Sequence, residues 1–322
     1  MAKLLEYGVT EDVSNKTYHS DDFFTSSTAV KMLYYDIPKY EKEYIQKNKT
    51  IFNSPALDMG SFIHTLILEP EKLEEEYAFF PGWDKRESGF KEFKEENSGK
   101  IIISQAQKMQ AKKMMDSFNS LKIAKDLISE SKTEITLCVD LFDVPVKVRF
   151  DAVNIEKGEI YDVKTSSYGV DYDTFKMQGI NNLKYEVSAG LYTLAASKFF
   201  GKPFNFYFVC LSKSTYATEI FKTGDILLST GQQRAKIGLE RLKEYRESGK
   251  WPANTIKKQD TSNYEILELW VFVKKLNRKE RQYFSKMLKL IIENPKSIFY
   301  EDQFLIKQWI KIQKNRREKK NG

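Results

Sequence analysis

The chain has 322 residues, which is enough for one large domain or two ordinary ones. Its 41% hydrophobic and 14% aromatic residues are typical of a globular protein and argue against disorder. No apolar run approaches the roughly 20 residues that span a bilayer, and the N-terminus has no signal-peptide pattern, so we expect a cytoplasmic protein without membrane contact. The net charge of +7 permits a polyanionic partner but does not establish one.

The first part of the chain is predicted to be helical. Apolar residues recur with helical spacing over 26–34, 39–47, 56–68 and 104–118, with a shorter helix to about residue 128. In the third of these helices, Ser54 supplies the N-cap, Pro55 the first turn and Pro70 the stop. Residues 82–100 are charged and punctuated by glycine, so we expect a mobile excursion there, either a lid or a DNA-facing loop.

The pattern changes at residue 134, where strands begin. The runs EITLCVD, VPVKVRFDAVN and EIYDVKTS, joined by short turns, predict an antiparallel meander. A short helix over 173–182 and a strong one over 183–200, closed by Gly201, precede two further strands, FNFYFVCLSK and YATEIFK. The chain from residue 224 is mostly helical in pattern. This order predicts an α/β fold, with a mixed central sheet flanked by helices and further helices at both ends.

The expected domain organisation is simple. We expect one domain over 1–250, with its core over about 54–222, and a basic helical segment over 251–322. The polar region 250–270, which contains Pro252, is the predicted linker. The strongly basic end of the last segment fits either a solubilising helix end or a nucleic-acid contact.

The two cysteines indicate a reducing compartment. Cys138 and Cys210 each stand alone inside an apolar stretch, so we expect buried thiols. Because no Cys-x-x-Cys pair occurs, a zinc ribbon or an iron–sulfur cluster is not expected.

Two aspartates lie near one end of the predicted hairpin. Asp151 ends the second strand-like run and Asp162 lies in the third. Strands joined by a short turn are about 4.8 Å apart, so the two carboxylates are expected to meet. About 4 Å apart, they would repel by ~4 kcal/mol at an effective dielectric of about 20. A shared proton, a basic partner or a divalent cation must offset this repulsion, and oxygen ligands suit Mg²⁺ or Mn²⁺.

Lys164 follows Asp162 by two positions, so both side chains point to the same face of the strand. An ammonium group there could orient or deprotonate an attacking water, or balance charge on a phosphorus transition state. The alternative is a plain ion pair without a metal, which an isolated Asp-x-Lys pattern favours because it is common. Asp151, one hairpin earlier, shifts the balance towards a metal site and leaves both interpretations open.

His64 is one of two histidines and lies on the apolar helix over 56–68, after the small residues Gly60 and Ser61. It is either a satisfied core residue, the commoner case, or a neutral ligand that completes a metal site or contacts phosphate. The other histidine, His19, has no context that singles it out. Glu134, near the first strand, is either an exposed edge residue or a further ligand.

Tyr192 and Ser188 share a helix face at a spacing of four residues, with Tyr185 one turn earlier. Two interpretations remain open for them. The side chains either pack against the sheet, or their hydroxyl groups reach a phosphate or the attacking water.

Three sequence blocks together resemble the PD-(D/E)XK nuclease superfamily, and within it the RecE-type phage exonucleases (exodeoxyribonuclease VIII-like). They are MGSFIHTLILEPEKLEEEYAFFP, VKVRFDAVNIEKGEIYDVKTSS and KYEVSAGLYTLAAS. The order and spacing of the blocks agree with the family from about residue 20 to 215. No resemblance is found beyond residue 225.

The resemblance implies a restriction-endonuclease-like core and a set of site residues. Asp151, Asp162 and the backbone carbonyl of Val163 would hold Mg²⁺ or Mn²⁺, and His64 would complete its coordination. Lys164 would position the attacking water, and Tyr192 matches the tyrosine of the family's helix. Further candidates for accessory roles are Glu134, Arg149, Thr165 and Ser188.

Two positions depart from the family pattern. Phe150 replaces the proline that usually precedes the aspartate, which is expected to be tolerated. Ser188 replaces a glutamine, which puts the positioning of the scissile strand and processivity in question.

By resemblance, the protein would be a metal-dependent deoxyribonuclease that degrades linear double-stranded DNA from its ends, 5′ to 3′, in phage or prophage recombination. A phage single-strand annealing protein would be its partner, and a homo-oligomer would surround the DNA. Two alternatives are an endonuclease of the same fold in restriction or defence, and a catalytically silent DNA-binding protein on a nuclease scaffold.

Overall fold

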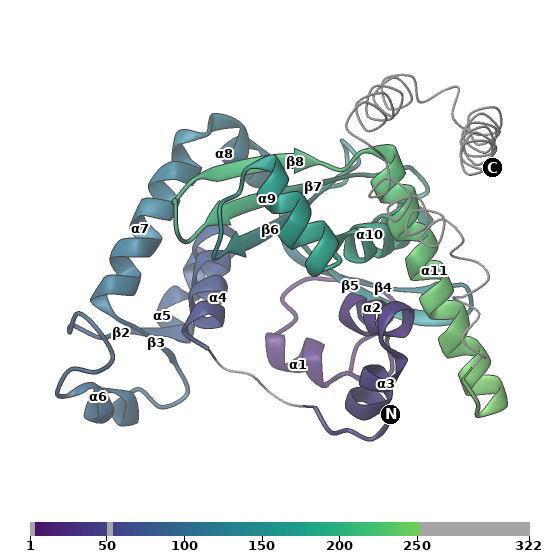
Figure 1. Ribbon diagram of the computed structural model, residues 1–322, viewed down its shortest axis with the longest axis horizontal. Coiled ribbons are helices and arrows are strands. Elements are labelled where there is room, and N and C mark those ends of the chain that lie inside the picture. Colours follow the sequence, from purple (N-terminus) through teal and green to yellow (C-terminus); the bar gives the residue numbers. More distant parts are fainter. Residues whose placement is uncertain (1–3, 50–53, 252–322) are drawn as a thin grey trace, which may run out of the picture. The chain divides into compact units, whose positions relative to one another are not determined.

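The structure, a computed structural model, describes residues 4–49 and 54–251 (Figure 1). The segment predicted over 251–322 and the linker predicted over 250–270 lie outside the described residues, apart from positions 250 and 251. The division into domains therefore stays a prediction. In the part of the chain that the structure describes, no helix combines the length and apolar character that a membrane span requires.

A six-stranded sheet forms the centre of the fold, in the order β1-β4-β5-β6-β7-β8. Its strands are β1 (Gly8–Thr10), β4 (Lys132–Leu141), β5 (Val144–Asn154), β6 (Glu159–Ser166), β7 (Asn205–Ser212) and β8 (Thr218–Lys222). Neighbouring strands are antiparallel except β6 and β7, which run parallel. The mixed α/β fold and the β4-β5-β6 meander predicted from the sequence are thus confirmed.

Local turn chemistry fixes the meander. Phe142 and Asp143 both have positive φ, 53° and 63°, which suits a two-residue hairpin loop between β4 and β5. Gly158, with φ 68°, closes the turn into β6. A Cβ atom at Gly158 would lie 2.8 Å from the carbonyl oxygen of Pro203, so the turn requires glycine.

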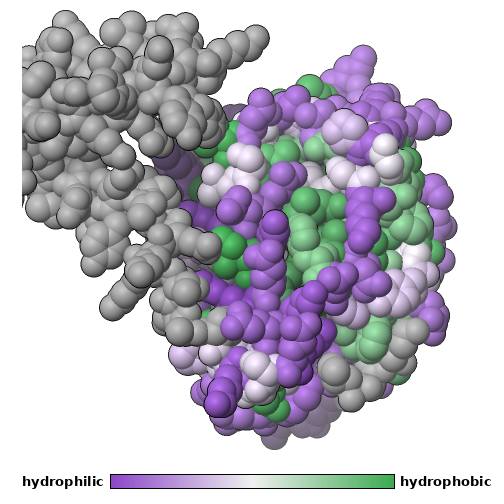
Figure 2. Space-filling model, turned by 90° about the vertical axis from the view of Figure 1, so that its right-hand side faces the viewer, coloured by the Kyte–Doolittle hydropathy of each residue, from purple (hydrophilic) through white to green (hydrophobic). Residues whose placement is uncertain are grey.

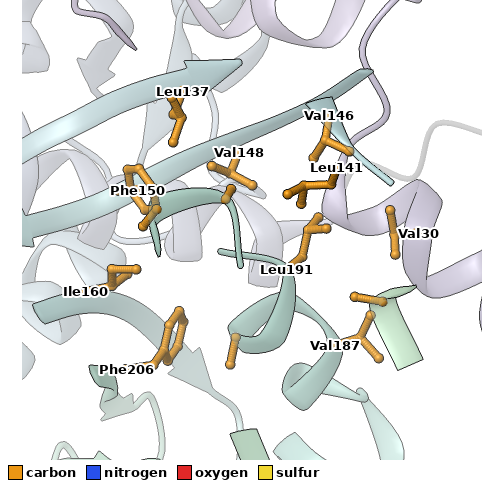
Figure 3. Packing of buried hydrophobic residues seen from close by; sticks show 14 of the residues in the cluster. Val30, Leu137, Leu141, Val146, Val148, Phe150, Ile160, Val187, Leu191 and Phe206 are labelled. Atoms are coloured by element: carbon orange, nitrogen blue, oxygen red, sulfur yellow. The ribbon is translucent and has the colours of Figure 1, made fainter. Parts of the chain in front are cut away.

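One face of the sheet is covered by α2 (Ser27–Tyr35), α10 (Tyr185–Phe200) and α11 (Asp225–Ser248). Because parallel strands need a crossover, α10 lies in the connection between β6 and β7. Figure 3 shows side chains of β4, β5, β6 and β7 meeting those of α2 and α10, among them Val30, Phe150 and Leu191. The outer side that carries α11 is mainly hydrophilic, with smaller hydrophobic areas between (Figure 2).

The other face is covered by α4 (Pro55–Leu68), α7 (Gln105–Ser120) and α8 (Lys122–Ser129). The start of α4 follows its sequence signals, because Pro55 opens the helix and the Ser54 hydroxyl accepts the N–H of Leu57. Alternate residues of β7 serve the two faces: Phe208 packs towards α10, and Val209 towards α4 and α7. The helices predicted at these positions are confirmed.

Shorter elements complete the described residues, and several were not expected from the sequence. They are α1 (Asn15–Ser20), α3 (Ile37–Tyr40), η1 (Glu41–Ile45), η2 (Pro70–Lys72), α5 (Leu73–Glu76), β2 (Tyr77–Phe79), α6 (Phe90–Glu96), β3 (Ile101–Ile103), α9 (Tyr172–Phe175) and η3 (Lys176–Asn182). The excursion expected over 82–100 contains α6, whose Phe90 and Phe93 pack on Phe80. Its mobility and its role as a lid or DNA-facing loop stay predictions.

Candidate active site

The candidate site lies where β5 and β6 stop pairing. Ala152 faces Tyr161 in the last bonded pair, and Asp151 and Asp162 are the next positions along the two strands. Instead of continuing the backbone ladder, Oδ2 of Asp151 accepts the N–H of Val163 at 2.7 Å. The aspartate side chain therefore takes the place of a strand partner, and its position is fixed by the sheet.

Glu134 stands opposite Asp151 in an unusual backbone conformation. The ladder between β4 and β5 pairs Thr133 with Ala152 and Ile135 with Phe150, with a gap at Glu134 and Asp151. At that gap Glu134 has φ 50°, in the left-handed region that costs a residue with a Cβ atom about 1–2 kcal/mol. Local strain of this kind is typical of functional sites.

The side chains of His64, Glu134 and Asp151 form a cluster that fits a metal site. Each offers one ligand atom, and these atoms lie within 4.8 Å of one another. Nδ1 of His64 is 3.7 Å from Oδ2 of Asp151. The three residues come from α4, β4 and β5, so the fold assembles the group from three elements.

The position of His64 depends on the close approach of α4 to β6. A Cβ atom at Gly60, one turn earlier, would lie 3.2 Å from Oγ1 of Thr165. The His64 side chain is 31% exposed and opens onto the site. Burial, reinforced by the Lys164 ammonium, lowers the pKa of His64 to about 4. The imidazole is therefore neutral at pH 7 and available as a ligand.

The pKa values of the two acids of the group, Glu134 and Asp151, are both raised. Burial and then the Asp151 carboxylate raise the pKa of Glu134 to about 8. Burial also raises the pKa of Asp151, although Lys164 and the Val163 N–H oppose the shift. A divalent cation would offset such crowding, and two carboxylates with a neutral imidazole are suitable ligands for Mg²⁺ or Mn²⁺.

Asp162 and Lys164 form an ion pair beside this group. Nζ of Lys164 is 2.5 Å from Oδ2 of Asp162, so the ion pair considered from the sequence is present. Asp162 is 3% exposed, and burial raises its pKa to about 6, with the Asp151 carboxylate as a further cause. Burial alone would lower the pKa of Lys164, but Asp162 and Asp151 raise it overall.

The aspartates are therefore close enough to influence each other, but Asp162 is not one of the three grouped ligands. The backbone of Val163 hydrogen-bonds with the His64 ring and opposes the fall of that residue's pKa. Thr165 contacts α4 at Gly60. The metal-ligand roles expected for Asp162 and the Val163 carbonyl stay predictions.

Tyr192 and Arg149 both line the cavity of the site. Tyr192 lines a cavity of about 280 Å³ together with His64, Glu134 and Asp151. Arg149 lines the same cavity, and its Nη1 donates to Glu134 at 3.4 Å. No side-chain hydrogen bond of Ser188 is found among residues 4–49 and 54–251, and Ser188 does not line this cavity. The accessory role expected for it stays a prediction.

Several residues of the same cavity were missed in the sequence. They are Asn15, Tyr18, His19, Ser26, Ser27, Thr28, Tyr44 and Lys49. They come from the N-terminal elements, whose α1 has six residues, too few to show a periodic pattern. A usable signal was the hydroxyl-rich run Ser26-Ser27-Thr28 at the start of α2, which brings polar groups to a helix end.

A mixed sheet with helices on both faces and an acidic group at the end of its central hairpin defines a PD-(D/E)XK-like α/β protein. The chain belongs to the family of PDDEXK-like domains of unknown function (DUF3799), whose model matches residues 26–260. The superfamily resemblance seen in the sequence is thereby confirmed, whereas the RecE-type specificity stays a prediction.

Among solved structures, the chain is similar to a protein of Eubacterium rectale described as a "Putative exonuclease". The two are 17% identical with a TM-score of 0.55, over 79% of this chain and 94% of the other. At that identity the likeness shows the fold alone. A second structure, SSO0001, has a TM-score of 0.30 and 11% identity over 68% of this chain and 80% of its own, and carries no argument. No curated protein matches the chain.

Proposed function

We propose that the protein is a metal-dependent deoxyribonuclease that hydrolyses phosphodiester bonds of linear double-stranded DNA from the ends. The observation that carries this proposal is the group of His64, Glu134 and Asp151 beside the Asp162–Lys164 pair, in a chain of the PDDEXK-like family. Hard oxygen ligands, a neutral imidazole and an ammonium group at one point suit the metal-assisted attack of water on a phosphodiester.

His64, Glu134 and Asp151 would hold the cation, with Asp162 and the Val163 carbonyl as further ligands. A bound Mg²⁺ or Mn²⁺ supplies charge neutralisation and makes the attacking water more acidic. Lys164 stays protonated because two carboxylates raise its pKa, so it acts as a fixed positive charge beside the phosphate rather than as a base. Asp162 holds that ammonium group in place.

We propose exonuclease rather than endonuclease action, and the recombination of phage or prophage DNA as its setting. The sequence resemblance to RecE-type enzymes and the description of the Eubacterium rectale protein support this choice. The same resemblance suggests 5′-to-3′ polarity, a single-strand annealing partner and a homo-oligomer. A silent DNA-binding protein is less favoured, because such a protein has no chemical need for Asp151, Asp162 and Lys164 together.

The test compares linear with covalently closed circular duplex DNA of the same sequence in Mg²⁺. We expect nucleotide release from the linear form only, and loss of that release in Asp162→Asn, because the variant loses a ligand charge and the anchor of Lys164. Asp143→Asn, which removes an exposed carboxylate from the β4–β5 turn, is the matched control and should stay active. Equal cutting of the circular form would replace the proposal with an endonuclease, and full activity of Asp162→Asn would contradict the site.

A further inference from the structure

A separate cavity of about 360 Å³ opens beside the proposed catalytic lysine. Lys164 and Thr165 at the end of β6 line it, together with the loop 166–170, η3 and the beginning of α10. The group of His64, Glu134 and Asp151 does not line this cavity, so it is distinct from the cavity of the candidate metal site. Lys164 thus belongs both to the proposed reaction centre and to the lining of this second cavity.

The lining offers unused amide groups. Gln178 and Asn182 lie four residues apart in η3, and the Asn182 amide donates to Oε1 of Gln178 at 3.0 Å. This leaves the Gln178 amide nitrogen as a donor and the Asn182 amide oxygen as an acceptor, neither with a partner among the described residues. An unpaired donor and an unpaired acceptor on two linked side chains of the lining are the kinds of group that hydrogen-bond the edge of a nucleobase.

Tyr168 offers an unused aromatic face at the same cavity. Its side chain is 58% exposed and stacks on no other ring in the described part of the chain. Its backbone is fixed, because its N–H donates to Oγ of Ser166 at 3.0 Å and its carbonyl accepts Oγ of Ser212 at 2.7 Å. An exposed ring on an ordered backbone is a ready stacking platform, and stacking on one base is worth about 1–3 kcal/mol.

The other two aromatic rings of the lining already contact other side chains. Phe175 stacks on Phe221 with centroids 4.7 Å apart, and Nζ of Lys164 lies 5.3 Å from the centroid of Tyr185. A positive charge lies next to the lining residue Leu183, because Nζ of Lys31 donates to its carbonyl oxygen at 3.2 Å. Among the described residues, Lys31 has no carboxylate partner, so it is free to contact a phosphate.

We propose that this cavity binds one unpaired nucleobase, that of the nucleotide next to the phosphate being cut. Its volume is at the lower end of the range for small-ligand sites, about 300–1,000 Å³. A DNA duplex is too wide to enter such a cavity, because its major groove alone is about 12 Å wide. The base therefore leaves the stack before hydrolysis. The inference rests on the proposed function, because it takes the reaction centre to lie at Lys164.

The test measures binding without hydrolysis, using a short single-stranded oligonucleotide that carries the fluorescent base 2-aminopurine, with EDTA present. We expect Tyr168→Ala to weaken binding about tenfold, which is 1.4 kcal/mol and within the range for one stacked base. Tyr168→Phe keeps the ring and should bind within twofold of the wild type. Tyr172→Ala is the matched control, because Tyr172 is 65% exposed nearby and does not line the cavity.

A second measurement compares hydrolysis of linear duplexes that have a paired or a mismatched terminal base pair. We expect faster release from the mismatched end, with a larger defect of Tyr168→Ala on the paired end. Equal effects of Tyr168→Ala and Tyr172→Ala on oligonucleotide binding, or no binding at all, would overturn the nucleobase site. Binding that depends on Tyr168 in a protein that releases no nucleotides would retain this site and reject the nuclease proposal.

Discussion

Glu134 combines two unfavourable features at one position, a left-handed backbone and a half-buried carboxyl group. Its φ of 50° is strained, and burial and Asp151 raise its pKa to about 8. The neighbouring ion pair with Arg149 has a long N–O distance of 3.4 Å, so it offsets little of the free energy that the strain and the burial cost. Strain of this kind is typical of functional residues, and this supports the ligand role proposed for Glu134.

We therefore expect Glu134→Gly to unfold at a higher urea concentration while losing nuclease activity. Glycine removes the left-handed penalty of about 1–2 kcal/mol, which exceeds its entropic cost of about 0.5–1 kcal/mol. The measurement is urea unfolding followed by a nucleotide-release assay on the same preparation.

The control for this prediction is Thr133→Gly, in the regular part of the same strand, which should lower stability by about 1 kcal/mol. A Glu134→Gly variant that is less stable than the wild type would show that the strain is not real. One that keeps full activity would remove Glu134 from the site.

At the scale of elements, the crossing of α10 and α11 determines where Tyr192 lies. A Cβ atom at Gly231 would lie 1.9 Å from the carbonyl oxygen of Glu186, and one at Gly190 would lie 2.2 Å from the backbone of Gly231. The two helix backbones touch at these glycines. Near this crossing, the buried carboxylate of Glu186 in α10 forms an ion pair of 2.8 Å with Arg234 in α11.

We expect Gly231→Ala to lower the free energy of unfolding by at least about 1–3 kcal/mol and to reduce activity, because α10 must move with Tyr192. Gly224→Ala, at the start of the same helix, is the control. A Cβ atom there meets nothing within 4 Å, and the change should cost less than about 1 kcal/mol. Thermal unfolding and nucleotide release measure both effects, and equal stability of the two variants would contradict the close crossing.

Elements with local signals could be predicted, and those that depend on distant partners could not. Ser54 and Pro55 mark the start of α4, and Gly201 marks the end of α10 with φ 70°. The three-residue β1 carries no periodic pattern of its own and forms only against β4. The parallel pairing of β6 with β7 also leaves no local trace, because it joins strands separated by a crossover.

The same distinction holds for the candidate site. Asp151, Asp162 and Lys164 could be selected by residue type and spacing, because a predicted hairpin brings these residues together. His64 lies on α4, and only the family resemblance selected it as a ligand. The place of Glu134 in the group depends on a left-handed conformation that nothing in its sequence context marks. The cavity residues of α1 are brought to the site by tertiary packing alone.

For the whole molecule, the grouped ligands predict a response to metal that can be measured without substrate. A cation that binds only the folded protein stabilises it by about 2.7 kcal/mol at a hundred times its dissociation constant. We expect Mn²⁺ to raise the melting temperature of the wild type and of Asp143→Ala, whose carboxylate is 81% exposed, but not of Asp151→Ala. An unchanged response in Asp151→Ala would place the ion elsewhere.

The inner position of β6 in the sheet should slow the hydrogen exchange of its backbone amides. This strand pairs with β7 along its whole length and with β5 over Glu159–Tyr161, whereas β1 and β8 are the outer strands of the sheet. We therefore expect the outer strands to fray first, and the amide protons that β6 shares with β7 to be among the slowest to exchange with deuterated water. The Val163 amide, which donates to the Asp151 side chain at the candidate site, then reports how long this contact persists.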